Sequence, residues 1–521
     1  MPTPSEKLAQ SLEILHKLQN WSGVGAIRSR DLSRTHRERL VANGFLQEVM
    51  KGWYIPSRPD EVKGESTAWY ASFWRFCAAY LEERFGKSWC LSPEQSLSLH
   101  GGNWAVPRQL VVRSPKARNK VTRLPHGTSL LDLRAVLPAK GDREGKDGLR
   151  IFPLESALIA CSPSYFSAHS TDARATLLMI RDASGILARL LEGGHSTIAG
   201  RLAGAFRNCG RDRIADDIAK TMTAAGYDVR ESDPFKDRPA LALPAREPSP
   251  YVNRIRLLWQ KMGGPVVGRF PKAPGLASDI NAYLKRVDDV YVTDAYHSLS
   301  IEGYRVSPEV IERVRSGAWN PEANEDDRQQ RNAMAARGYW QAYQAVRGSV
   351  GRVLHNENPG LVADEDHGTW YREMFAPSVT AGLMKASHLA GYRNGRVYIR
   401  GSMHVPLNCD AVRDAMPAFF DLIQAETDPA VRVVLGHFIL VYIHPYMDGN
   451  GRMGRFLMNL MLASAGYPWT VTPVEDRKAY MEALEKASVG EDIVPFADFL
   501  AGLVRKGLAG EPLPTVPKSA G

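Results

Sequence analysis

The sequence is poor in cysteine, and its few cysteines are far apart. Cys77, Cys90, Cys161, Cys209 and Cys409 are the only ones in 521 residues, and no two of them form a Cys-x-x-Cys pair. A disulfide-stapled secreted domain or a structural zinc site would need closely spaced cysteines. We therefore expect a protein of a reducing compartment without structural zinc.

Long apolar runs are also absent. The first ten residues, MPTPSEKLAQ, contain no apolar signal region. No run reaches the roughly 18 apolar residues that a membrane helix needs. We expect no membrane segment and place the protein in the cytoplasm.

The charge balance is only mildly basic. The chain has 66 Lys and Arg against 57 Asp and Glu, a formal net charge of +9, with 44% hydrophobic and 24% charged residues. This composition is typical of soluble proteins, and the length allows several domains. The surplus suggests an anionic partner but does not identify one.

The most informative stretch is 444–455, HPYMDGNGRMGR. It joins two apolar runs, 431–443 and 456–462, which predict buried helices. Gly449 and Gly451 allow a tight turn whose N–H groups lie at the start of the second helix. Unpaired donors and the helix dipole favour an anion there.

Four side chains of this stretch predict a polyphosphate site with a base beside it. Arg452 and Arg455 are three residues apart on one helix face and can bind phosphate oxygens in bidentate fashion. Asp448 offers a hard oxygen suited to Mg²⁺, and His444 can accept a proton near neutral pH. The structural alternative is a glycine turn between core helices whose arginines are merely solvated.

These residues resemble the signature of the Fic family, His-Pro-Phe-x-Asp/Glu-Gly-Asn-Gly-Arg-x-x-Arg, with Tyr446 in place of Phe. Members of this family typically transfer AMP from ATP to a hydroxyl side chain of another protein. The resemblance implies that His444 deprotonates the target hydroxyl and that Asp448 holds Mg²⁺. It implies an ATP-binding set of Gly449, Asn450, Gly451, Arg452 and Arg455. A phosphorylating branch of the family carries Lys where this chain has Gly451, which favours nucleotidyl transfer.

A second motif precedes the first by about 150 residues. The stretch 297–304, HSLSIEGY, resembles the Ser/Thr-x-x-x-Glu-Gly/Asn signature of the inhibitory helix of many Fic proteins, with Ser298, Glu302 and Gly303 at its fixed positions. The resemblance implies that Glu302 pairs with Arg455 and occupies the place of the γ-phosphate. Some self-inhibited members use this glutamate to remove AMP, so de-adenylylation remains open. In isolation the stretch would be a helix end with a surface glutamate.

Residues 396–405, RVYIRGSMHV, alternate β-branched and polar residues around glycine turns and predict a short hairpin. In Fic proteins this hairpin is a flap that holds an extended target segment by strand addition. The target-binding residues implied are Val397, Tyr398, Ile399, Ser402 and His404. An ordinary packing hairpin is the alternative.

The first 60 residues resemble a winged helix-turn-helix. We expect an amphipathic helix over 6–20, two short helices over 29–43 and a two-stranded wing over 45–55. The predicted DNA contacts are Arg34, His36, Arg37 and Arg39. The alternative is a small helical domain with a solvated basic face or a protein-docking wing.

The middle of the chain carries no sharp motif. Residues 61–230 predict a mixed α/β domain whose layout, after a winged helix, resembles antitoxin regulators of abortive-infection systems. Residues 101–131 contain no acidic residue, so this stretch is either a nucleic-acid footprint or a basic loop. A proline-rich linker is expected over 231–250.

The sequence thus predicts a mainly α protein in three parts: a winged helix-turn-helix (1–60), a mixed α/β domain (61–230) and, after the linker, a helical Fic domain with a hairpin flap (251–510). The inhibitory helix is expected near 293–303 and a disordered tail over 511–521. The expected function is ATP- and Mg²⁺-dependent adenylylation of an unidentified target protein, restrained by Glu302. The alternative is a DNA-binding regulator or antitoxin-like protein whose Fic core senses ATP.

Overall fold

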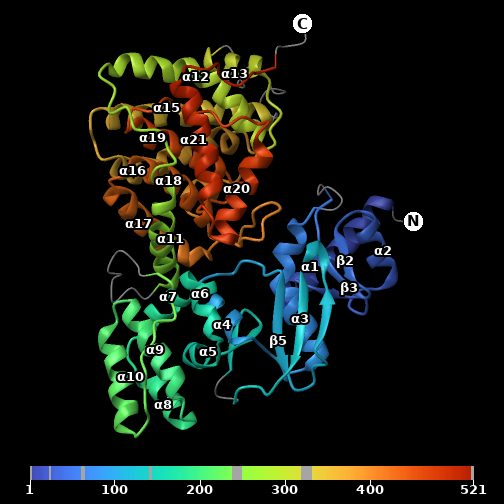
Figure 1. The fold of residues 1–521 in the computed structure, drawn as a ribbon. Helices are drawn as coiled ribbons and strands as arrows, with labels where there is room; N and C mark the ends of the chain where they lie inside the picture. The colour runs from blue at the N-terminus through green and yellow to red at the C-terminus, as the bar shows by residue number, and fades with distance from the viewer. Residues whose placement is uncertain are drawn as a thin grey trace. The chain divides into compact units, whose positions relative to one another are not determined.

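The computed structural model describes residues 3–22, 25–59, 65–139, 143–237, 249–317 and 331–517. The chain divides into two compact units (Figure 1). Unit 1 comprises Met1–Arg254 and Tyr398–Val405, and unit 2 comprises Ile255–Val397 and Pro406–Gly521. None of the helices in the described residues is both long and apolar enough to cross a membrane.

Unit 1 begins with two helices and a small antiparallel sheet. The elements are α1 (Pro4–Ser22), β1 (Ile27–Arg28), α2 (Arg34–Ala42), β2 (Leu46–Met50) and β3 (Trp53–Pro56), with strand order β1-β3-β2. Their apolar core is formed by Leu15, Ile27, Leu32, Leu40 and Leu46.

One helix, α2, stands where two short helices were expected over 29–43. The carboxylate of Asp31 accepts the N–H of Arg28 at 2.9 Å and holds residues 28–31 as a turn. Ser33 caps α2 by accepting the N–H of His36 at 3.4 Å. The local hydrogen bonds of two polar side chains therefore delay the helix to Arg34.

The remainder of unit 1 combines sheets with short helices. A four-stranded sheet has the order β4-β5-β7-β6, with β5 and β7 parallel and the other pairs antiparallel. The strands are β4 (Cys90–Leu91), β5 (Gln109–Ser114), β6 (Lys120–Arg123), β7 (Ser129–Arg134), and the separate pair β8 (Glu144–Lys146) and β9 (Leu149–Ile151). The helices are α3 (Thr67–Phe85), α4 (Pro93–His100), η1 (Pro125–Gly127), α5 (Leu154–Ala160), α6 (Pro163–Ala168), α7 (Ser170–Met179), α8 (Ser184–Gly193), α9 (Ser196–Asn208) and α10 (Asp212–Ala224). Aromatic residues of α3, including Trp69, Phe73 and Phe76, form the core beneath the four-stranded sheet.

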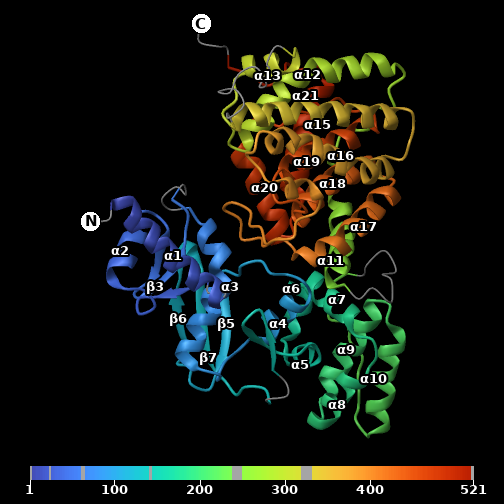
Figure 2. The ribbon, with the colours of Figure 1, turned by 180° about the vertical axis from the view of Figure 1, so that it is seen from behind.

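Unit 2 is helical, and its described residues contain no strand. Its helices are α11 (Pro250–Val266, which starts in unit 1), α12 (Ile280–Ile301), α13 (Pro308–Arg315), α15 (Arg331–Leu354), α16 (Pro359–Thr380), η3 (Ala386–Ala390), α17 (Cys409–Ala425), α18 (Pro429–Ile443), α19 (Asn450–Ala463), α20 (Arg477–Gly490) and α21 (Val494–Leu508). Helices α15, α16, α18 and α19 pack together (Figures 1 and 2). Nearly every residue of α18 and α19 is buried, including Arg452 and Arg455 of α19.

The start and the end of α18 have clear local causes. Asp428 caps its first turn by accepting the N–H groups of Ala430 at 2.8 Å and Val431 at 3.0 Å. The helix ends at His444, which adopts the left-handed conformation with φ 55° and ψ 59°. Gly449, with φ 80°, then starts α19. The turn between two core helices is therefore formed as the sequence predicted.

Residues 396–405, where the sequence predicted a hairpin, form turns and irregular chain without strand pairing. Backbone groups of this segment form hydrogen bonds with residues outside it. The N–H of Gly401 donates to Thr67 Oγ1 at 3.0 Å, and the Met403 carbonyl accepts from Val106 N–H at 2.8 Å. A short two-stranded hairpin is marginal alone, so such outside partners replace its internal ladder.

Two other predicted segments fall partly outside the described residues. Of the expected linker, 231–237 and 249–250 are described and 238–248 are not. Of the expected tail, 511–517 are described as irregular chain, and Pro517 lines a cavity together with Tyr304. Residues 321–327, which the sequence predicts as an acidic surface turn, lie outside the described residues.

Candidate functional site

His444 is held as a neutral base at the end of α18. Its Nδ1 lies 3.2 Å from the Val441 carbonyl, which can only accept, so Nδ1 carries the proton and Nε2 is left as an acceptor. Burial lowers the pKa of His444 to about 4, although the Val441 carbonyl acts in the opposite direction. At neutral pH the imidazole is therefore uncharged and able to take a proton.

Asn450 holds the loop between the two helices. Its Oδ1 accepts the N–H of Tyr446 and its Nδ2 donates to the Tyr446 carbonyl, both at 2.9 Å. The Tyr446 ring is 1% exposed and stacks on Tyr371 with ring centroids 3.9 Å apart. The side chain of Asn450 thus shapes the loop.

Arg452 is a buried cation without hydrogen-bond partners on two of its nitrogens. It is 1% exposed, and its guanidinium lies 5.2 Å from the Tyr304 ring and 5.1 Å from the Phe375 ring. Nε and Nη2 have no hydrogen-bond partner among the described residues, and Nη2 is 3.6 Å from Asp448 Oδ1. Two aromatic faces stabilise the charge but leave its donors available.

Arg455 is bound by Ser298 and Glu302. Its Nη2 donates to Glu302 Oε1 at 2.7 Å and to the Ser298 carbonyl at 3.0 Å, and its Nε donates to Ser298 Oγ at 2.9 Å. Nη1 is buried and finds no hydrogen-bond partner in the part of the chain that the structure describes. Burial would raise the pKa of Glu302, but Arg455 and then Arg452 outweigh it and lower that pKa below its ordinary value. The predicted ion pair is therefore formed, with Glu302 charged.

The Glu302 carboxylate lies against the first turn of α19. A Cβ placed on Gly451 would lie 2.3 Å from Glu302 Oε1, so the glycine leaves the space that the carboxylate fills. Gly303, with φ 86°, turns the chain just after α12, and the N–H of Tyr304 returns to the Leu299 carbonyl at 3.0 Å. An acidic group thus occupies the place where a helix N-terminus favours a phosphate.

Asp448 is the one acidic residue of the 444–455 loop. Its side chain is 50% exposed, and Oδ1 accepts the N–H of Gly449 at 2.6 Å. Among the described residues, no group of three or more His, Cys, Asp or Glu side chains is placed to hold a metal ion. Mg²⁺ commonly binds through one carboxylate plus substrate phosphates, so an accessible single carboxylate fits that ion.

The predicted target-binding residues are divided between the two units. Val397 belongs to unit 2, whereas Tyr398, Ile399, Ser402 and His404 belong to the segment Tyr398–Val405 of unit 1. His404 is 4% exposed. Within unit 1 this segment is also held by Arg400, whose Nη2 donates to Glu65 at 2.8 Å. Of the five residues, Val397 therefore shares a unit with His444 and the other four do not.

All four predicted DNA contacts bond to other residues of unit 1. His36 Nδ1 lies 2.9 Å from Ser11 Oγ, Arg39 Nη1 donates to the Lys7 carbonyl at 2.8 Å, and Arg37 Nη1 donates to the Ser29 carbonyl at 2.9 Å. Arg34 is 82% exposed and pairs with Glu38 at 2.7 Å. The basic face of α2 is thus smaller than the sequence indicated.

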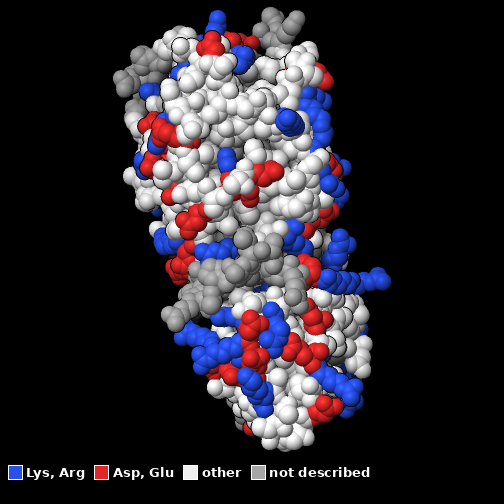
Figure 3. Space-filling view, turned by 60° about the vertical axis from the view of Figure 1, so that its left-hand side comes forward, with Lys and Arg blue, Asp and Glu red and all other residues white. Residues whose placement is uncertain are grey.

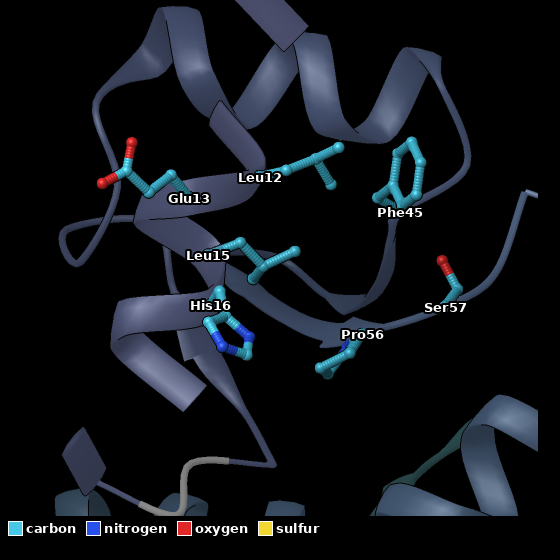
Figure 4. A pocket seen from close by; sticks show the side chains of 7 residues that line it. All are labelled: Leu12, Glu13, Leu15, His16, Phe45, Pro56 and Ser57. Atoms are coloured by element: carbon cyan, nitrogen blue, oxygen red, sulfur yellow. The ribbon is translucent and has the colours of Figure 1, made fainter. Parts of the chain in front are cut away.

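A second cavity lies beside α1 (Figure 4). Its volume is about 480 Å³, and it is lined by Leu12, Glu13, Leu15, His16, Phe45, Pro56 and Ser57. Its one acidic residue, Glu13, pairs with Lys17 at 2.7 Å. This largely apolar cavity lacks the charged groups found around Gly451.

Sequence reasoning missed several residues of the site. Tyr304 and Phe375 cover Arg452, Arg477 Nε donates to the Ile301 carbonyl at the end of α12 at 2.8 Å, and Arg393 Nε donates to the His444 carbonyl at 2.7 Å. Tyr304 directly follows the inhibitory motif, which is the one signal available. The other three act across the tertiary structure.

Part of the chain is similar in sequence to known proteins. Residues 369–462 match the Fic/DOC family. The chain is 39% identical over 121 residues to "Protein adenylyltransferase Fic" of Drosophila willistoni, covering 22% of this chain and 24% of that protein. It is 41% identical over 115 residues to the protein of the same name from Nematostella vectensis, covering 21% and 26%. The chain thus spans about a quarter of the length of these relatives.

Solved structures are also similar. Fic-1 from C. elegans is 21% identical, with a TM-score of 0.36 and coverage of 63% of this chain and 90% of that one. A Fic domain signalling protein from Bacteroides thetaiotaomicron is 17% identical, with a TM-score of 0.35 and coverage of 51% and 99%. From the family match and the motif geometry, this chain carries a Fic/DOC family domain at residues 369–462.

Proposed function

We propose that this protein is a self-inhibited protein adenylyltransferase, which transfers AMP from ATP to a hydroxyl side chain of a target protein. The observation that carries the proposal is the set of buried guanidinium nitrogens without partners around Gly451. These are Nε and Nη2 of Arg452 and Nη1 of Arg455. Relatives named protein adenylyltransferase match over the segment that contains them.

The unpaired nitrogens favour a polyphosphate ligand. A buried donor without a partner costs about 1–3 kcal/mol, and more when it is charged. Phosphate oxygens would satisfy these donors through charge-assisted hydrogen bonds, helped by the N-terminus of α19. We assign ATP binding to Gly449, Gly451, Arg452 and Arg455, with Asn450 shaping the loop.

His444 is assigned as the general base. In the proposed step the target hydroxyl oxygen bonds to the α-phosphorus, the bond from that phosphorus to the leaving oxygen breaks, and pyrophosphate departs. The hydroxyl proton passes to Nε2 of His444, which is a free acceptor because Nδ1 is engaged with Val441. Asp448 would hold Mg²⁺, whose charge neutralises the phosphates.

Glu302 is assigned as the inhibitor. It removes Arg455 from the phosphate site and places a negative charge where a phosphate would lie. Like charges repel strongly where water is excluded, so ATP would bind poorly or out of line for attack. Removal of this carboxylate should therefore activate the enzyme.

The test is incorporation of label from α-labelled ATP into protein in a cell lysate. We expect strong labelling by Glu302→Gly, weak labelling by wild type and none by Glu302→Gly combined with His444→Ala. Glu475→Gly is a matched control, since Glu475 is 62% exposed and lies beside His297 of α12 without contacting Arg455. Equal labelling by all four proteins would contradict the proposal. Mass spectrometry of the labelled peptides would identify the target and the acceptor residue.

Binding of DNA by the first 60 residues stays a separate prediction, supported by the helix α2 and the small sheet β1-β3-β2. Basic and acidic side chains are interspersed over the face seen in Figure 3, so the net charge of +9 is not concentrated there. We expect Arg34→Ala to weaken binding to the upstream DNA of this protein's own gene, measured by fluorescence anisotropy, without changing protein labelling. Binding that disappears by about 0.2 M salt would mark non-specific attraction.

A cytoplasmic location also stays a prediction. It is supported by the five cysteines, all of which are free thiols in the structure. Free thiols are typical of reducing compartments.

A further inference from the structure

Arg393 links the catalytic loop to the chain that leads into segment 396–405. Its guanidinium is 2% exposed and, among the described residues, donates only to backbone carbonyls. Nε reaches the His444 carbonyl at 2.7 Å, Nη1 the Gly395 carbonyl at 3.0 Å, and Nη2 the carbonyls of Leu407 and, at 3.5 Å, Ile443. Its own N–H donates to the Pro445 carbonyl at 2.9 Å.

These contacts need an arginine. The planar guanidinium has five donors in a fixed fork, whereas a lysine ammonium has three donors and cannot span three chain segments in one plane. No carboxylate in the described part of the chain forms an ion pair with Arg393, so the buried charge is balanced by carbonyl dipoles. Burial without a counter-charge is unfavourable, and it lowers the pKa of Arg393 to about 10. Because burying the Arg393 charge costs free energy, we expect the residue to serve a function.

The backbone that Arg393 holds is itself strained. His444 is not glycine, yet it adopts φ 55°, a conformation that side-chain-bearing residues rarely take. Such a conformation persists only where the surroundings fix it. Arg393 bonds the carbonyls of Ile443, His444 and Pro445, the three consecutive residues centred on that strain.

Charged and polar groups face the imidazole of His444 from several elements. Arg393 lies on the chain after η3, Glu302 on the end of α12 and Asp448 on the loop before α19, while Val441 contributes its carbonyl from α18. The two carboxylates favour the protonated imidazole and Arg393 opposes them. Arg393 therefore acts on His444 through both geometry and charge.

We propose that Arg393 is a positioning residue for His444, which fixes the left-handed end of α18 so that the imidazole faces the reacting hydroxyl. The inference rests on the proposed adenylyltransferase function. A small misplacement of a catalytic group can lower a rate by as much as about a hundredfold. Loss of Arg393 should therefore lower kcat and leave ATP affinity nearly unchanged, because none of its contacts is to Arg452 or Arg455.

The test uses the full chain in the Glu302→Gly background, with Arg393→Met and Arg393→Lys as variants. Arg432→Lys is the matched control, since Arg432 is also partly buried, donates to a backbone carbonyl and lies near the opposite end of α18. We expect kcat to fall by at least about tenfold in Arg393→Met with KM for ATP within about twofold, and to recover in part in Arg393→Lys. Arg432→Lys should keep kcat.

A second readout does not depend on activity. With ¹³C-labelled histidine, the NMR signal of His444 is assigned by its loss in His444→Ala, and its titration is followed in each variant. We expect the midpoint to move up toward the ordinary histidine value in Arg393→Met and to stay in place in Arg432→Lys. Unchanged kcat and titration in folded Arg393→Met would overturn the inference. The inference would also be overturned if variants at Arg393 and Arg432 both lost activity in proportion to the fraction of unfolded protein.

The two proposals can fail separately. Absence of labelling by the Glu302→Gly parent would contradict the proposed function. The His444 titration would still decide whether Arg393 controls the imidazole.

Discussion

Gly451 decides whether the inhibitory glutamate fits. A Cβ there would lie 2.3 Å from Glu302 Oε1, yet an alanine in a helix is ordinarily about 1 kcal/mol more stable than a glycine. The effect of Gly451→Ala on the free energy of unfolding should therefore have opposite signs in wild type and in the Glu302→Gly variant. We expect Gly451→Ala to destabilise wild type and to stabilise the Glu302→Gly variant by about 1 kcal/mol, measured by urea unfolding.

The control for this prediction is Gly264→Ala, because a Cβ at Gly264 of α11 meets no atom within 4 Å. It should have the same effect with and without Glu302. If Gly451→Ala changed stability with the same sign in both backgrounds, the carboxylate would not occupy the position described.

Asp294 should make stability depend on pH. It is 3% exposed on α12 and accepts the Tyr339 hydroxyl at 2.6 Å, and burial raises its pKa to about 6. The unfolded chain loses this proton near pH 4 and the folded protein near pH 6, so this group lowers stability as pH rises between these values. The full effect is about 3 kcal/mol at 1.36 kcal/mol per pKa unit.

Asp294→Asn removes this ionisation. We expect the free energy of unfolding of the variant to rise relative to that of wild type between pH 4 and pH 6.5, and the difference to stay constant above pH 6.5. Urea unfolding across this range measures it. Asp288→Asn is the control, because Asp288 lies on the same helix, is 44% exposed and pairs with Arg347 at 2.6 Å. A constant difference between wild type and Asp294→Asn would contradict the raised pKa.

At the scale of elements, the end of α12 is anchored from α20. Arg477 Nε donates to the Ile301 carbonyl at 2.8 Å, where the helix dipole favours a cation. Val474 N–H donates to His297 Nδ1 at 3.1 Å close by. These contacts fix the last turn of α12, and therefore Glu302, against α19.

Loss of the Arg477 anchor should release Glu302 in part. We expect Arg477→Leu to raise protein labelling by about fivefold over wild type, which corresponds to a hydrogen bond of about 1 kcal/mol. Lys478→Leu is the control, because Lys478 is 87% exposed and its ion pair with Glu482 is long, at 3.9 Å. Equal labelling by the two variants would show that this anchor does not support inhibition.

The elements also show how far local sequence patterns reach. The apolar runs 431–443 and 456–462 predicted two buried helices, and α18 and α19 contain them. Helix α19 begins six residues before its apolar run, since the motif residues from Asn450 onward form its first turns. The hairpin expected over 396–405 is absent because its backbone bonds to Thr67 and Val106, which no pattern within ten residues could indicate.

At the scale of the whole molecule, unit 1 is completed by a segment from far along the chain. Residues Tyr398–Val405 group with it, and Arg400 pairs there with Glu65, whose side chain is 12% exposed. The Arg400 side chain is 62% exposed, so water and salt screen the pair. A coupling of about 0.2–1 kcal/mol is expected for such a pair.

A double-mutant cycle with Glu65→Ala and Arg400→Ala tests this coupling. The quantity measured in each variant is the rate of chymotryptic cleavage after Tyr398. Each single variant should speed cleavage, and the double variant should add little to either. Arg372→Ala, an exposed arginine that bonds to Thr369 outside this segment, is the control. Additive effects of the two variants would mean that the pair does not hold the segment.

The sequence by itself determined which residues the proposed chemistry rests on: a histidine, a glycine turn and two arginines at fixed spacing, with a glutamate ahead of them. Helix periodicity, capping and turn geometry depend on neighbours along the chain, so these features can be read from residues 297–304 and 444–455. The tertiary structure decided what surrounds them, including the rings of Tyr304 and Phe375, the anchor at Arg477 and the carbonyl contacts of Arg393. These contacts join residues distant in sequence. Every residue has a backbone carbonyl, so no side-chain pattern can predict which carbonyl will be the acceptor.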